Sequence, residues 1–139
     1  MQSVLYDTSF YVQALRMGGS DLSDLGRRQF GPVWLSSVVL SELYMGIGFQ
    51  DLPEVEKLQQ DFQRVGRILV PTLSDWELGG RLLARLAEKH DYEAVGLSRL
   101  MNDALIAMSA ARTGITVVTA NRRDFQRIAE FRRFKWVSH

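Results

Sequence analysis

Two acidic residues, Glu42 and Asp103, stand inside apolar segments and are the first candidates for chemistry. At helical spacing, the neighbours of Glu42 are Val38, Val39, Met45 and Gly46, and those of Asp103 are Arg99, Leu100, Ile106 and Ala107. A carboxylate on an apolar face is costly unless it is paired, hydrogen-bonded or bound to a metal ion. Two alternatives stay open: Arg99 pairs with Asp103, or Glu42 faces water because its helix is rotated.

Two further aspartates follow apolar runs that predict buried strands. Asp7 comes directly after Val4 to Tyr6, and Asp124 lies in the segment TANRRDF that follows ITVVT. Each has a structural alternative, because Asp7-Thr8-Ser9 could cap a helix beginning FYVQAL, and Asn121 could cap a helix with Asp124 at its third position. Capping and catalysis are compatible, since a capping carboxylate is held in a fixed direction.

These four acids have a common explanation if the fold brings them together. Two unit charges about 4 Å apart repel by about 4 kcal/mol at an effective dielectric of 20, and a divalent cation removes that conflict. Oxygen ligands select hard ions such as Mg²⁺ or Mn²⁺. Such an ion can activate a water molecule and stabilise charge on a phosphodiester. We therefore predict that Asp7, Glu42, Asp103 and Asp124 are catalytic, metal-binding residues.

The composition limits the other classes of function. The 139-residue chain is 46% hydrophobic and 24% charged, which fits one ordered domain covering residues 1–139. It has no cysteine, which excludes thiol chemistry and disulfides and suits a reducing cytoplasm. Its first residues, MQSVLYD, lack the pattern of a signal peptide, and no window resembles a membrane span. We expect a cytoplasmic protein with no membrane partner.

The net charge of +1 conceals an uneven distribution along the chain. Before Arg112, 10 basic residues stand against 14 acidic ones, whereas from Arg112 onward 7 basic residues stand against 2. The basic segment includes Arg122, Arg123 and Arg127. It could contact the phosphates of a polyanion, or it could be a solvated helix face.

The elements that must position these acids alternate between strands and helices. Strands are predicted at Val4 to Tyr6, Val33 to Ser36, Arg67 to Val70, Ile115 to Thr119 and Lys135 to Val137. Helices are predicted at Ser37 to Phe49, Glu54 to Val65, Asp75 to Lys89, Leu100 to Arg112 and Arg122 to Glu130. Ser74 and Glu77 are predicted to form a capping box, and Gly114 to end a helix. This alternation predicts an α/β fold with functional residues at the carboxyl ends of parallel strands.

Three segments follow one another along the chain: VLYDTSFYV, SSVVLSELYMGI and NDALIAMSAARTGITVVTANRRDF. Together and in this order, they resemble PIN domains of the VapC toxin class. The resemblance implies a three-layer α/β/α fold with a mainly parallel sheet of four or five strands. It implies an Mg²⁺- or Mn²⁺-dependent endoribonuclease that leaves a 3′-hydroxyl and a 5′-phosphate. It also implies an RNA substrate, a cognate antitoxin that covers the active site, and a homodimer.

The resemblance also assigns residues. Asp7, Glu42 and Asp103 match the three metal-binding acids of the family, and the fourth acidic position falls in TANRRDF. Many relatives have an acid where this chain has Asn121, so that Asp124 is either the compensating carboxylate or only a nearby one. Thr8, Ser9, Thr119 and Asn121 match polar positions that contact substrate or water, and we expect them to position the substrate.

Two other classes of acidic site fit the sequence less well than a PIN-like nuclease site. A response-regulator phosphoacceptor would need a lysine after a late strand, and a dehalogenase-like phosphatase would need Asp-x-Asp where this chain has Asp7-Thr8-Ser9. Two alternatives stay open: a catalytically inactive PIN-like module that binds proteins, and a housekeeping RNA-processing nuclease.

Overall fold

The computed structural model describes residues 2–17, 31–90 and 94–138. Its strands form a single five-stranded sheet in the order β3-β2-β1-β4-β5, and every pair is parallel. The strands are β1 (Val4–Tyr6), β2 (Val33–Ser36), β3 (Ile68–Leu69), β4 (Thr116–Thr119) and β5 (Trp136–Ser138). The predicted α/β class and parallel sheet are confirmed.

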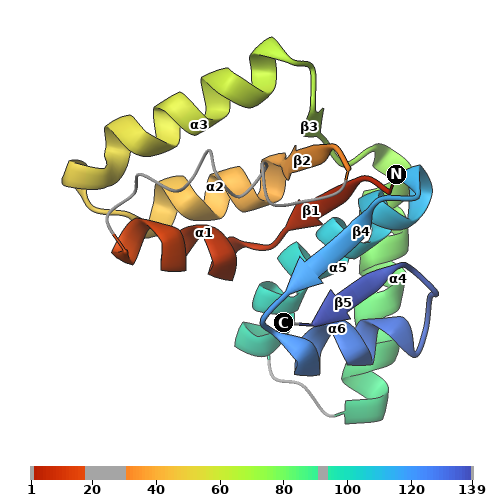
Figure 1. Ribbon diagram of the computed structural model, residues 1–139. Coiled ribbons are helices and arrows are strands. Elements are labelled where there is room, and N and C mark those ends of the chain that lie inside the picture. Colours follow the sequence, from red (N-terminus) through yellow and green to blue (C-terminus); the bar gives the residue numbers. More distant parts are fainter. Residues whose placement is uncertain (1, 18–30, 91–93, 139) are drawn as a thin grey trace.

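Helices cover both faces of this sheet in a three-layer α/β/α arrangement (Figure 1). They are α1 (Thr8–Arg16), α2 (Ser37–Gly46), the short 3-10 helix η2 (Phe49–Asp51), α3 (Leu52–Arg64), α4 (Leu73–His90), α5 (Ala94–Thr113) and α6 (Arg122–Ala129). In Figure 1, α1, α2 and α3 lie on one side of the sheet, and α4, α5 and α6 lie on the other. None of the helices in the described part of the chain is long and apolar enough to cross a membrane.

The core lies between the sheet and the two helical layers. Strand β4 is buried along its whole length, and α5 packs a continuous buried stretch from Ala104 to Ala110 against the sheet and α4. The small side chains of this stretch let α5 approach the strands closely. As predicted, α5 is followed by Gly114, whose φ of +73° is a conformation that favours glycine.

Several boundaries differ from those that the sequence predicts, and the largest difference is at α5, which begins at Ala94 instead of Leu100. The helix expected over Ser37 to Phe49 ends at Gly46, because Gly48 and Pro53 mark a break before η2 and α3. The capping box predicted at Ser74 and Glu77 is wrong. Helix α4 begins at Leu73, and its box is formed by Thr72 and Asp75: the Asp75 carboxylate accepts from the Thr72 backbone N–H at 2.9 Å.

A buried ion pair also holds the Asp75 carboxylate. Its side chain is 0% exposed and receives the Arg112 guanidinium, with Nε 3.2 Å and 3.1 Å from the two carboxylate oxygens. Arg112 lies in the last turn of α5, so the pair joins the start of α4 to the end of α5. The carboxylate is therefore fully occupied by its cation and by the backbone.

Candidate functional site

The carboxyl ends of β1 and β4 are adjacent, and they mark the point where the strand order changes direction. From β1 the chain continues outward to β2 and β3, and it then returns to form β4 on the other side of β1. In open α/β sheets this switch point leaves a crevice outside the strand ends. Asp7 follows β1 directly, and the segment from Asn121 to Asp124 follows β4.

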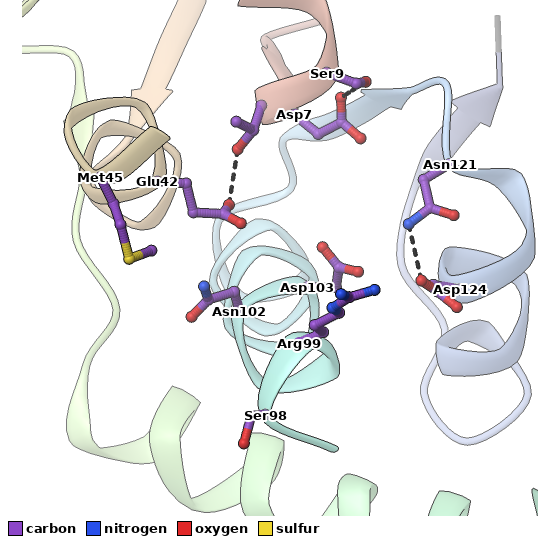
Figure 2. Close-up of a pocket in the computed structure, with 11 residues that line it drawn as sticks. Asp7, Ser9, Glu42, Met45, Ser98, Arg99, Asn102, Asp103, Asn121 and Asp124 are labelled. Atoms are coloured by element: carbon purple, nitrogen blue, oxygen red, sulfur yellow. Dashed lines mark hydrogen bonds between the residues drawn. The ribbon is translucent and has the colours of Figure 1, made fainter. Parts of the chain in front are cut away.

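A hollow of about 550 Å³, here called the acidic pocket, lies at this edge (Figure 2). It is lined by Asp7, Thr8, Ser9, Glu42, Met45, Ser98, Arg99, Asn102, Asp103, Asn121 and Asp124. The four predicted acids therefore meet in one place, although they belong to segments spread from residue 7 to residue 124. Figure 2 shows the Glu42, Asp103 and Asp124 carboxylates approaching the space beneath Asp7 from different elements.

Asp7 is buried, with 5% of its surface exposed, and two hydroxyl groups hold its carboxylate. Ser9 donates to one carboxylate oxygen, and Thr119 donates to the other. Asp7 stands at the N-cap of α1, but its side chain makes no capping hydrogen bond. The capping alternative is therefore correct for position and wrong for the role of the carboxylate, which is directed by side chains from α1 and β4.

Glu42 is held from the neighbouring helix. The Thr8 hydroxyl donates to its carboxylate over 2.7 Å, which joins the first residue of α1 to α2. The predicted apolar surroundings are half right: Val38 and Val39 are buried, but Met45 is 79% exposed and lines the pocket. Glu42 thus lies at the border between core and pocket, because α2 ends at Gly46 and leaves its last turn exposed.

Asp103 lies on α5 between the core and the pocket, as its apolar neighbours predicted. The pKa of Asp103 is raised to about 8, mainly by burial and then by the carboxylates of Asp124, Glu42 and Asp7, in that order. In the part of the chain that the structure describes, Arg99 makes no ion pair with Asp103, and Arg99 is exposed. The simple pairing of these two residues is therefore wrong.

Asp124 is fixed by Asn121, which stands at the N-cap of α6. The Asn121 amide donates to the Asp124 carboxylate over 2.9 Å, and its backbone N–H donates to the Thr119 hydroxyl over 2.8 Å. The Asn121 side chain makes no capping bond, contrary to the capping interpretation. Thr119 therefore accepts from Asn121 and donates to Asp7, so that one hydroxyl links both strand ends.

Three polar residues of α5 complete the pocket and were not predicted as site residues. Ser98, Arg99 and Asn102 line it from the side opposite Asp7. Asn102 could have been recognised from the Asn-Asp-Ala segment that contains Asp103. Ser98 and Arg99 carry no such signal, because they reach the pocket only through the helical repeat of α5.

We tested whether this donor set fits a divalent cation. The acids supply only oxygen ligands, and Asp103 is close enough to Asp124, Glu42 and Asp7 for their charges to raise its pKa in addition to the larger effect of burial. Among the described residues, no three acidic side chains lie close enough to enclose an ion by themselves. Mg²⁺ commonly binds through one or two carboxylates and keeps several water molecules. The pocket therefore suits a partly hydrated ion better than an ion that is enclosed by protein ligands alone.

Comparison with known structures finds chains of similar fold. The structure of DNA-bound VapBC from Salmonella typhimurium matches with a TM-score of 0.70 at 21% identity, covering 99% of this chain and 98% of that one. VapBC2 from Rickettsia felis, bound to a promoter DNA fragment, matches with a TM-score of 0.67 at 23% identity and 99% coverage of both chains. VapBC-1 from nontypeable Haemophilus influenzae matches with a TM-score of 0.62 at 16% identity, covering 99% and 98%.

At these identities the likeness shows a shared fold. No curated protein sequence matches the chain. The PIN domain family model, however, matches residues 4–131, which include every acid of the pocket. The chain therefore belongs to the PIN domain family.

Proposed function

We propose that this protein is an Mg²⁺- or Mn²⁺-dependent endoribonuclease, acting as the toxin of a VapBC-type toxin-antitoxin pair. PIN domains are generally nucleases. The observation that carries the proposal is the convergence of Asp7, Glu42, Asp103 and Asp124 on one pocket at the switch point of the sheet. Four carboxylates in one hollow are a poor arrangement for stability alone, since their charges repel.

The residues divide into two groups by what they touch. Asp7, Glu42, Asp103 and Asp124 are the proposed metal-binding, catalytic residues. A divalent cation bound there would lower the pKa of a water molecule and stabilise negative charge on the phosphodiester. The sequence predicts that Thr8, Ser9, Thr119 and Asn121 position substrate, yet the hydrogen bonds of their side chains in the structure join them to an acid or to another member of this group. We propose that they mainly hold the carboxylates in direction.

The deciding experiment is cleavage of RNA by the purified protein with and without Mg²⁺ or Mn²⁺. Asp7→Asn is expected to fold like the parent and to lose at least about 100-fold in rate, because a neutral amide weakens cation binding. Asp61→Asn is the matched control, since Asp61 lies on exposed α3 and pairs only with Arg64 at 3.4 Å. Equal rates for Asp7→Asn and the parent would exclude this mechanism.

The inactive binding module is the alternative function, and the absence of a three-acid cluster among the described residues favours it. The two functions differ in the response to metal. An endoribonuclease should melt at a higher temperature when Mn²⁺ is added, and Asp103→Asn should remove that rise. A chain without RNA cleavage and without a Mn²⁺-dependent rise in melting temperature would be the binding module.

The antitoxin partner is proposed because the structural neighbours are VapBC complexes. Two exposed apolar side chains support it: Met45 lines the pocket, and Phe49 of η2, four residues further along the chain, is 94% exposed. A partner segment lying there would close the pocket against RNA. The product of the adjacent gene should inhibit cleavage, and Phe49→Ser should weaken that inhibition while leaving uninhibited cleavage unchanged.

The homodimer, the cytoplasmic location and the single domain over residues 1–139 stay predictions. Leu73 and Trp76 share one face of α4 and are 83% and 51% exposed, which offers an apolar surface for a second copy. Light scattering should give twice the 15.8 kDa chain mass. Leu73→Ser should reduce it to that of one chain.

A further inference from the structure

The exposed face of α6 carries a second hollow, of about 400 Å³. It is lined by Arg122, Arg123, Gln126, Arg127 and Glu130, which are called the arginine face below. The opposite side of the same helix buries Phe125 and Ile128 in the core. The helix is therefore fixed by its apolar side, and its polar side is presented as a rigid surface.

Helix stability does not explain the first two arginines of this face. Arg122 and Arg123 are the first residues of α6, where the positive end of the helix dipole disfavours cations. Both are exposed, and neither makes an ion pair with another residue of the described ranges. The nearest acid in sequence, Asp124, is instead bonded to the Asn121 amide. Their position suits an anion that comes from outside the chain.

The one acid of the arginine face is already engaged elsewhere. The Glu130 carboxylate accepts from Lys89 over 2.7 Å and lies 3.4 Å from the His90 ring nitrogen, both on α4. Its bond to Lys89 is the main reason that the pKa of Glu130 is lowered. Glu130 is thus an anion held by α4, and within the described residues the positive charge of Arg122 and Arg123 has no ion-pair partner.

The arginine face adjoins the acidic pocket through the start of α6. Asn121 and Asp124 line the acidic pocket, and Arg122 and Arg123 lie between them in sequence and line the second hollow. A nucleic-acid strand with one phosphate at the acids would place a neighbouring phosphate near these guanidinium groups. Arginine binds phosphate oxygens with two parallel hydrogen bonds, which fixes the direction of a strand.

We propose that Arg122 and Arg123 form a backbone-binding subsite for single-stranded RNA, on one side of the phosphate that is cleaved. This rests on the proposed function, because it assigns the strand that the acidic pocket would cut. The subsite binds phosphate and carries no base preference, since a positively charged groove tracks the backbone of any sequence. It holds the RNA in register while the acids act on the adjacent phosphodiester.

The test measures binding separately from cleavage. In the Asp7→Asn background, Arg122→Gln/Arg123→Gln is compared with Arg132→Gln/Arg133→Gln, which removes the same charge from exposed residues just after α6 that do not line either hollow. The probe is a fluorescent 12-nucleotide RNA without secondary structure, followed by anisotropy at several KCl concentrations. Glutamine keeps the helix propensity of arginine and removes only its charge.

The Arg122/Arg123 variant is expected to bind at least about tenfold more weakly at 0.1 M KCl. Its slope of log affinity against log salt should fall by about 1.4, the value for two lost phosphate contacts on a single strand. The Arg132/Arg133 variant should stay within about twofold of its parent. In the cleavage-competent background, the first variant should raise KM and leave kcat unchanged.

Three results would overturn the subsite: equal weakening in both variants, no weakening in either, or an arginine effect confined to a DNA oligonucleotide of the same sequence. These results are distinct from a failure of the proposed function. If Arg122→Gln/Arg123→Gln weakens RNA binding but the parent never cleaves RNA, the subsite holds and the nuclease proposal fails. If the parent cleaves RNA and the variant binds and cleaves RNA like the parent, the nuclease proposal holds and the subsite proposal fails.

Discussion

Asp75 and Asp103 are carboxylates on two helices that pack against each other, and they have opposite surroundings. Asp75 is buried against the Arg112 guanidinium and the Thr72 backbone N–H. Asp103 has burial and three other carboxylates around it, which together raise its pKa. Asp75 is fully buried and Asp103 partly so, but among the described residues only Asp75 receives a cation. Burial of a carboxylate therefore identifies a functional site only where the chain leaves its charge uncompensated.

The largest effect is expected on catalysis. Asp103→Asn should lower the rate of RNA cleavage about 1,000-fold, equivalent to about 4 kcal/mol of transition-state stabilisation, because it removes a proposed cation ligand from the centre of the acidic pocket. Single-turnover cleavage with saturating Mn²⁺ measures it. Circular dichroism should show an unchanged fold. A fully active Asp103→Asn protein would move the reaction away from this pocket.

The next largest effect is expected on the free energy of unfolding, when Asp75 loses its partner cation. Arg112→Met should lower the free energy of unfolding by about 3 kcal/mol, because it leaves Asp75 buried without its cation. Urea denaturation measures it. Arg81→Met is the control, since Arg81 pairs with Glu77 on the exposed side of α4 and should change stability by less than about 1 kcal/mol. Similar losses in both variants would mean that Asp75 does not depend on Arg112.

A smaller change in stability, of opposite sign, is expected when Asp103 is replaced by Asn in the absence of metal. Because its folded pKa of about 8 lies above its ordinary value, the parent should lose stability as pH rises from about 4 to about 8. Asp103→Asn cannot ionise, so in EDTA at pH 8 it should be more stable than the parent by about 2 kcal/mol, less than half of what a shift of about four pKa units would give, because the partly exposed side chain is screened by solvent. The difference should vanish near pH 4. Thermal melts across this range measure it, and a difference that does not change with pH would contradict the pKa shift.

The smallest effect separates the last two residues of the pocket. Asp124→Asn should lower the metal-dependent rate about tenfold, or about 1.4 kcal/mol, because it removes one carboxylate at the rim. Asn121→Asp should stay within about threefold of the parent, since the resemblance to the family implies that an acid is accepted at this position. The ratio of rates at limiting and saturating Mn²⁺ measures both. Equal activity of Asp124→Asn and the parent would place the fourth ligand elsewhere.

The sequence predicted the class of fold because its signals are local. Apolar β-branched runs predicted β1, β2 and β4, and the position of Gly114 predicted the end of α5. It also selected Asp7, Glu42, Asp103 and Asp124, which the fold brings to one pocket. The metal-binding and catalytic roles of these residues stay predictions.

The partners of each side chain were beyond the reach of sequence patterns. The Asp75 carboxylate, which caps α4 together with Thr72, binds the Arg112 guanidinium 37 residues away. Thr119 binds Asp7 across 112 residues, and Thr8 binds Glu42 across 34. Such bonds depend on which strands become neighbours, and periodicity in one segment carries no information about that.

Asp75 and Asp103 show which properties of a carboxylate the sequence determines and which depend on the tertiary structure. By itself, the sequence determined that acids stand in and beside apolar segments, since residue type and helical spacing are local properties. Only the tertiary structure decided that Asp75 has a cation and that Asp103 has other acids around it. The reason is physical: the free energy of a buried charge depends on the charges that surround it in space, and folding alone brings those charges together.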